Sequence, residues 1–139
     1  MGDNDLIFFS REASKEISDF LISSWLIIKN QWPKAFLDPH KVLDIDSQYK
    51  SIIYDPNFYI QKTLGCKSIN YLLADVLKEQ YNNNFNLSAI DSFNSIINNC
   101  KLNDYDWRLG KTLSGISSES GFRKVTKILK NEEPFIRKE

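Results

Sequence analysis

The stretch REASKEISDFLISSWLIIKNQ, residues 11–31 of the 139-residue chain, determines the fold class. Its apolar residues recur at intervals of three and four, the period of one face of an α-helix. Ile22, Leu26 and Ile27 add apolar surface on the flanks of that face. A helix that is apolar on most of its circumference packs on more than one side, so we expect a central helix here. Pro33 ends it, because proline lacks an amide donor and clashes with the preceding turn.

Three further segments have a helical period. They run from about Cys66 to Tyr81, from about Ser88 to Asn99, and from about Ser118 to Asn131. Residues 33–57 never sustain that period for three turns and are expected to form a long irregular loop or insertion. With no internal repeat and no strand–helix alternation, the sequence predicts a mainly α fold. We expect a single-domain helical bundle of about four helices over residues 1–139.

Composition narrows the classes of function. The chain has 18 Lys and Arg against 18 Asp and Glu, which argues against a strongly cationic coat for nucleic acid. From Arg108 onward, however, eight basic side chains face four acidic ones, so this last part is basic and the rest acidic. Cys66 and Cys100 stand far apart without a neighbouring histidine, a pattern that predicts free thiols and no metal site.

Neither an export signal nor a membrane span is evident. The acidic start MGDND lacks the basic region of a signal peptide. The longest nearly apolar run, FLISSWLII, has nine residues, whereas a membrane span needs about 20. We therefore expect a cytoplasmic protein without a membrane partner.

No motif indicates catalysis. The single histidine, His40, follows a proline in a polar loop, and neither a Ser-His-Asp order, a Walker loop nor an HExxH motif occurs. The acidic pairs Asp44-Ile-Asp46 and Asp104-Tyr-Asp106 could bind a divalent ion, but they lack the spacing of a metal-binding loop. We expect exposed loop acids, no enzyme activity and no cofactor. An unrecognised carboxylate enzyme would require all four acids to meet in one cleft.

The stretch LSGISSESGFRKVTKIL, residues 113–129, is the candidate binding site. Gly115-Ile-Ser resembles the turn of a helix-turn-helix, but the apolar set begins at Phe122, one residue late, and Lys111 stands where a small residue is expected. A second interpretation is an anion site, because the start of a helix exposes unpaired amides at its positive dipole end. Glu119 opposes this by placing a negative charge there. A third interpretation is an ordinary capped amphipathic helix.

The candidate nucleic-acid contacts follow from the anion interpretation. Small residues at the helix start would present backbone amides, and basic residues on the outer face would meet phosphates. The candidates are Ser117, Ser118, Gly121, Arg123, Lys124, Lys127 and Lys130.

The order of three segments resembles a known family. The first segment is a helix that ends in Trp-Pro, in FFSREASKEISDFLISSWLIIKNQWPKAF. The second is a Lys-Thr-x-Gly step into a Leu-rich helix, in YIQKTLGCKSINYLLADVL. The third is a Ser/Gly turn before the last helix, in SGISSESGFRKVTKIL. This order resembles the C-terminal region of DGQHR-domain proteins, which include DndB-like regulators associated with DNA phosphorothioate modification. The DGQHR sequence that names the family is absent. The resemblance implies a C-terminal fragment or a solitary relative, linked to DNA modification or defence, without catalytic residues.

Two function hypotheses follow. The first is a non-enzymatic accessory or regulatory domain that contacts DNA through the basic last helix. The second is a protein-interaction module that docks on a larger partner through exposed Phe and Trp residues between Trp32 and Tyr59, which would form an apolar surface patch. The second hypothesis competes with the expectation that Trp25, Trp32 and Trp107 belong to the core.

Overall fold

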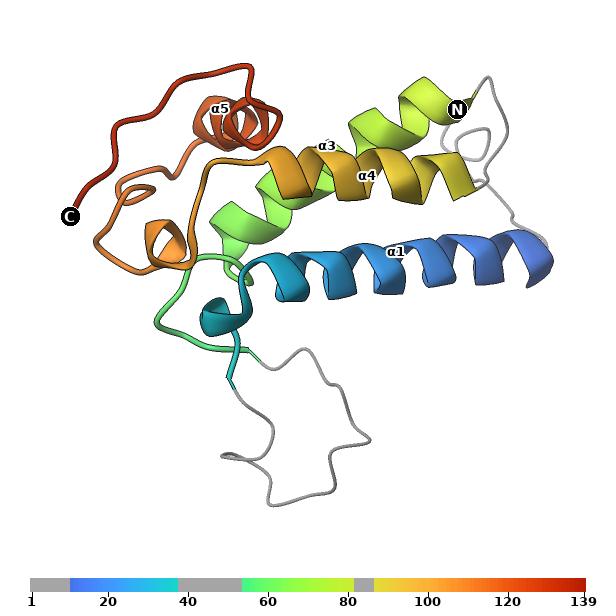
Figure 1. The fold of residues 1–139 in the computed structure, drawn as a ribbon, viewed down its shortest axis with the longest axis horizontal. Coiled ribbons are helices and arrows are strands. Elements are labelled where there is room, and N and C mark those ends of the chain that lie inside the picture. Colours follow the sequence, from blue (N-terminus) through green and yellow to red (C-terminus); the bar gives the residue numbers. More distant parts are fainter. Residues whose placement is uncertain (1–10, 38–53, 82–86) are drawn as a thin grey trace, which may run out of the picture.

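The computed structural model describes residues 11–37, 54–81 and 87–139. These ranges fold mainly into helices (Figure 1). The α-helices are α1 (Arg11–Gln31), α3 (Thr63–Tyr81), α4 (Leu87–Asn99) and α5 (Glu119–Leu129), and the short 3-10 helices are η2 (Pro33–Ala35) and η3 (Asp104–Trp107). The predicted mainly α bundle of about four helices is confirmed.

The predicted loop over residues 33–57 is only partly visible. Residues 38–53, including His40, lie outside the described residues. Before these residues the chain forms η2. After them, residues 57–59 pair with residues 107–109. Tyr59 N donates to Trp107 O at 2.7 Å, and Leu109 N donates to Asn57 O at 2.9 Å. The ends of the loop are therefore fixed against η3 and the residues after it.

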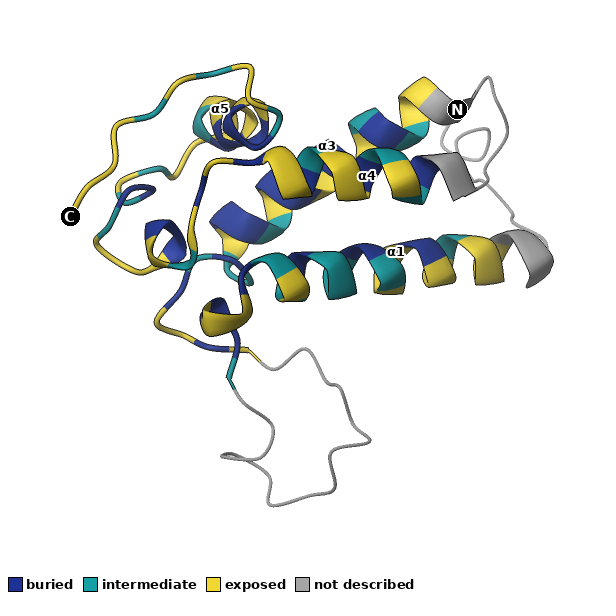
Figure 2. Ribbon diagram, in the orientation of Figure 1, coloured by how far each residue is buried: buried dark blue, intermediate teal, exposed yellow. Residues whose placement is uncertain are grey.

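The central helices of the bundle are α4 and α3 rather than α1. Helix α4 packs against α1 and α3, and α3 packs against α4 and α5. In Figure 1, α1 lies along one edge beside α4. The expectation that residues 11–31 pack on two sides is wrong, because Leu21 is 39% exposed and Ile22 58% exposed. Figure 2 shows exposed positions along α1. Periodicity identified the helix but not the number of neighbours that cover it.

Two tryptophans from distant parts of the chain meet in the core. The rings of Trp32 and Trp107 contact edge to face, with their centroids 5.2 Å apart, and both side chains are fully buried. The indole Nε1 of Trp32 donates to the backbone oxygen of Leu102 at 2.9 Å. These contacts attach the end of α1 to η3, as the expectation of core tryptophans required.

Helix α3 begins one turn before the predicted start, at a close backbone approach. The amide of Gly65 donates to Tyr59 O at 3.1 Å, which brings the preceding loop against the first turn. A Cβ atom at Gly65 would lie 2.1 Å from the backbone oxygen of Ile60. Glycine is therefore required by packing, and this gives the Lys-Thr-x-Gly step a structural cause.

Replacing Gly65 by alanine is expected to lower the free energy of unfolding by about 2 kcal/mol, because the new methyl group overlaps a backbone atom and the loop must shift. Urea denaturation followed by circular dichroism measures this loss. Asn70→Ala, at an exposed position of the same helix, is the control and is expected to change stability by less than about 0.5 kcal/mol. Equal unfolding midpoints for the two variants would contradict the close approach.

Helix α5 is a capped amphipathic helix. Ser118 is its N-cap, with Oγ accepting from Gly121 N at 3.1 Å, and the turn before it uses Gly115 at φ 84°. Its inner face is buried against α3, where Thr126 Oγ1 donates to Ser68 O at 2.7 Å. The helix ends two residues before the predicted Asn131, which adopts φ 61° and reverses the chain.

Candidate nucleic-acid interface on α5

Three of the four candidate cations stand exposed on the outer face of α5. Arg123, Lys124 and Lys127 are exposed, whereas Phe122 before them and Val125 between them are buried. Figure 2 shows the same division between exposed and buried residues around α5. Because positions separated by three and four residues lie on one side of a helix, the three cations form one basic face.

The three cations differ in their neighbours. The Arg123 guanidinium lies 4.2 Å from the ring centroid of Tyr71 of α3, a cation–π contact. Lys124 Nζ lies 4.0 Å from Glu133 Oε1, a weak exposed ion pair. The side-chain ammonium of Lys127 makes no hydrogen bond or ion pair with any residue that the structure describes. Lys127 is therefore the cation most available to an external anion.

The fourth candidate cation, Lys130, has an internal partner. Its Nζ lies 2.6 Å from Asp75 Oδ2, and its side chain is only 18% exposed. Burial alone would lower the pKa of Lys130, but the hydrogen bond and attraction of Asp75 raise it above its ordinary value. The ion pair fastens the end of α5 to α3, so we leave Lys130 out of the external basic face.

The small residues at the start of α5 serve its own cap. Ser117 and Ser118 are exposed, but the Gly121 amide already donates to Ser118 Oγ. A Cβ atom at Gly121 would lie 2.7 Å from Ile116 Cγ2, so the glycine makes room for that side chain. The Gly121 amide is thus already hydrogen-bonded within the chain. The contact with Ile116 explains the glycine, so the close approach of an anion is not needed to explain it.

Glu119 fills the anion position at the helix start. Its carboxylate accepts hydrogen bonds from Lys67 Nζ and Tyr71 OH of α3. These two hydrogen bonds lower the pKa of Glu119, so the side chain stays charged at neutral pH beside the positive end of the helix dipole. A ligand phosphate would have to displace it. The accessible part of the site is the basic face and not the helix start.

The acidic pair of η3 has a structural role. Asp104 Oδ2 accepts from Lys34 N at 2.7 Å and links η3 to η2. The expectation of an exposed acid is wrong for Asp106, which is 1% exposed and accepts from Asn103 N (2.8 Å) and Thr112 Oγ1 (2.6 Å). Asn103 caps η3 reciprocally, a pattern of Asn followed three residues later by Asp that the sequence already contained.

Metal binding finds no support in the described ranges. They contain no group of three or more His, Cys, Asp or Glu side chains placed to hold a metal ion. Asp44 and Asp46 lie outside the described residues, so the four-acid cleft has no described counterpart. Cys66 and Cys100 are free thiols, and burial raises the pKa of Cys100 to about 11.

The aromatic residues expected to dock a partner are buried. Trp32, Phe36 and Phe58 are each less than 10% exposed, which corrects the prediction of an aromatic patch between residues 32 and 59. Among the described residues of that range, the exposed large apolar side chain is Tyr54, and elsewhere the adjacent residues Leu21 and Ile22 of α1 are both exposed. The apolar residues on the flanks of that helix were the sequence feature that could have indicated this exposed surface.

Comparison with known proteins gives no relative from which a role could be transferred. No protein-family model matches the chain, and no curated protein or solved structure is significantly similar to it. Among the described helices, none is long and apolar enough to cross a membrane. The residues themselves must therefore support any function.

Proposed function

We propose that the chain is a non-enzymatic accessory domain that contacts the DNA phosphate backbone through Arg123, Lys124 and Lys127, and that it is related to the C-terminal region of DGQHR-domain proteins. The supporting observation is one exposed basic face on a helix whose opposite face is anchored in the core. Such a face presents positive charge without any chain rearrangement.

The number of cations on the basic face determines the expected affinity for DNA and its dependence on salt. Each phosphate neutralised by Lys or Arg contributes about −0.9 to the slope of log K against log salt concentration. Three contacts give a slope of about −3 and weak binding without sequence preference, with Kd of roughly 10⁻⁴ to 10⁻⁶ M. The formal net charge of zero adds no general attraction, so the contact depends on this local face.

Lys127→Gln is expected to reduce the magnitude of the salt slope by about one, because one phosphate contact is lost. Fluorescence anisotropy of a labelled duplex, titrated at several salt concentrations, measures the slope. Lys15→Gln removes an exposed cation from α1 and is the matched control, with an unchanged slope. Absence of duplex binding at low ionic strength, or equal slopes for both variants, would refute the proposal.

A second candidate function is a protein-interaction module. The adjacent exposed side chains of Leu21 and Ile22 on α1 favour it, because apolar surface of this kind is buried in protein–protein contacts. This surface lies on the edge of the bundle formed by α1, whereas the basic face belongs to α5 (Figure 1). The two functions therefore predict effects at separate places.

A further inference from the structure

The residues after α5 return across the turn region that precedes the helix. Asn131 reverses the chain, and residues 132–139, which we call the closing segment, run without helix or strand (Figure 1). Phe135 is half-buried and packs against the core, while Ile136 is 88% exposed. The segment thus resembles a short peptide bound to the surface of the bundle.

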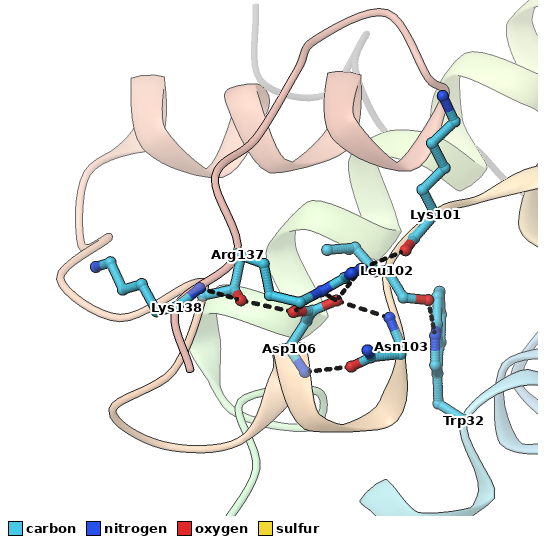
Figure 3. A network of polar contacts seen from close by, with 8 residues as sticks. Trp32, Lys101, Leu102, Asn103, Asp106, Arg137 and Lys138 are labelled. Carbon is cyan, nitrogen blue, oxygen red and sulfur yellow. Dashed lines mark hydrogen bonds and ion pairs between the residues drawn. The ribbon is translucent and has the colours of Figure 1, made fainter.

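An arginine of this segment enters a polar receptor centred on Asp106. Arg137 Nε donates to both oxygens of the carboxylate, at 3.0 and 3.2 Å, and Nη2 donates to Asp106 Oδ2 at 3.1 Å and to Lys101 O at 2.9 Å (Figure 3). Asn103 N and Thr112 Oγ1, which belong to the bundle itself, fix the same carboxylate. The Asp106 carboxylate and the facing Lys101 carbonyl match the planar fork of N–H donors on a guanidinium. The receptor therefore favours an arginine side chain over a lysine ammonium.

An apolar groove lies beside the arginine receptor. Leu113, Ile116 and Ile128 line it together with Phe135 and Ile136 of the closing segment, and its volume is about 460 Å³. The closing segment does not fill this space, since Ile136 is turned mostly to solvent. Phe135 packs along this groove against the core, so the closing segment places an aromatic residue two positions before the arginine that the receptor binds.

Further contacts hold the closing segment, namely the Glu132 N to Lys127 O hydrogen bond (2.8 Å), the weak Lys124–Glu133 ion pair (4.0 Å) and the contacts of Lys138. Lys138 N donates to Thr112 Oγ1 at 3.1 Å, and its ammonium donates to Ser114 Oγ at 3.0 Å. The Arg137 side chain is itself 45% exposed. Segments with few buried contacts open at low free-energy cost. Opening, however, leaves the buried Asp106 carboxylate without its cation, so a replacement guanidinium would be favoured.

We propose that the closing segment is a displaceable internal ligand, and that its groove binds a peptide of another protein with an aromatic residue two positions before an arginine. The internal segment competes at an effective concentration in the millimolar range, as expected for a short connection. External peptides therefore bind appreciably only when they exceed it in affinity or when the segment is released.

The test uses the full chain with Phe135→Ala and Arg137→Gln, which removes both internal anchors. The probe is a fluorescent peptide with the sequence EEPFIRKE of residues 132–139. Anisotropy is expected to show binding at least about tenfold tighter to the double variant than to the unaltered chain, with a further loss of about tenfold when the peptide arginine is replaced by lysine. Equal binding of the arginine and lysine peptides, or no binding to a folded double variant, would overturn the proposal.

A milder variant covers the case in which the double variant does not fold. Arg137→Lys keeps the charge but loses the fork of donors, so the segment should open more readily. The same peptide is expected to bind this variant at least about threefold tighter than the unaltered chain. Identical affinities would overturn the proposal.

Discussion

Replacing Trp32 by alanine is expected to lower the free energy of unfolding by about 3–5 kcal/mol, the range for removing a large buried aromatic side chain. Trp32 is fully buried, its ring packs edge to face on Trp107, and its Nε1 satisfies the backbone oxygen of Leu102. The variant loses all three interactions and leaves a cavity between α1 and η3. Urea denaturation followed by far-ultraviolet circular dichroism measures the loss.

The matched control is Trp25→Ala in the same helix. Trp25 is only partly buried against the core, so we expect a loss of about 1–2 kcal/mol. Equal losses of unfolding free energy for Trp25→Ala and Trp32→Ala would contradict the burial of Trp32 and its contact with η3.

Asp106→Ala is expected to destabilise the chain by about 3 kcal/mol at pH 7, because it leaves buried donors without an acceptor and releases Arg137. Asp104→Ala is the control two residues away. It removes a single hydrogen bond to Lys34 N and is expected to cost about 1 kcal/mol. The same denaturation measurement compares the two, and a larger loss for Asp104→Ala would contradict the assignment of Asp106 as the buried centre.

The dependence of stability on pH provides an independent readout for Asp106. Burial alone would raise its pKa, but hydrogen bonds from Arg137, Thr112 and the Asn103 amide hold the pKa below its ordinary value. A carboxyl whose folded-state pKa is lowered stabilises the fold above its unfolded pKa, about 3.9, and loses that contribution as the pH falls through the folded value. The stability of Asp106→Ala should therefore decline less steeply than that of the unaltered chain below about pH 5.

The sequence predicted the elements better than their neighbours. The bounds of α1 and the inward set of α5 follow from periodicity, which depends on local spacing alone. Which helix becomes central depends on contacts between segments far apart in the chain, and for this reason Ile22 was expected to be covered and is exposed. Gly65 is a similar case, since its role depends on the approach of Ile60.

The charged residues show even more clearly that sequence patterns do not predict contacts between distant segments. Lys127 in the last turn of α5 and Lys130 at its C-cap look equivalent in sequence, yet only Lys130 contacts Asp75, a residue 55 positions away. Glu119 was identified as an obstacle to anion binding, but its partners Lys67 and Tyr71 could not be inferred. Long-range ion pairs thus decided which candidate cations stay accessible.

The proposed contact with the DNA phosphate backbone lies on α5. Its most direct test is a titration of the isotope-labelled full chain with a short DNA duplex at low ionic strength, followed residue by residue by nuclear magnetic resonance. The account predicts that the largest shifts occur at Arg123, Lys124 and Lys127 and weaken with added salt. Shifts confined to Leu21 and Ile22, or no shifts at all, would contradict it.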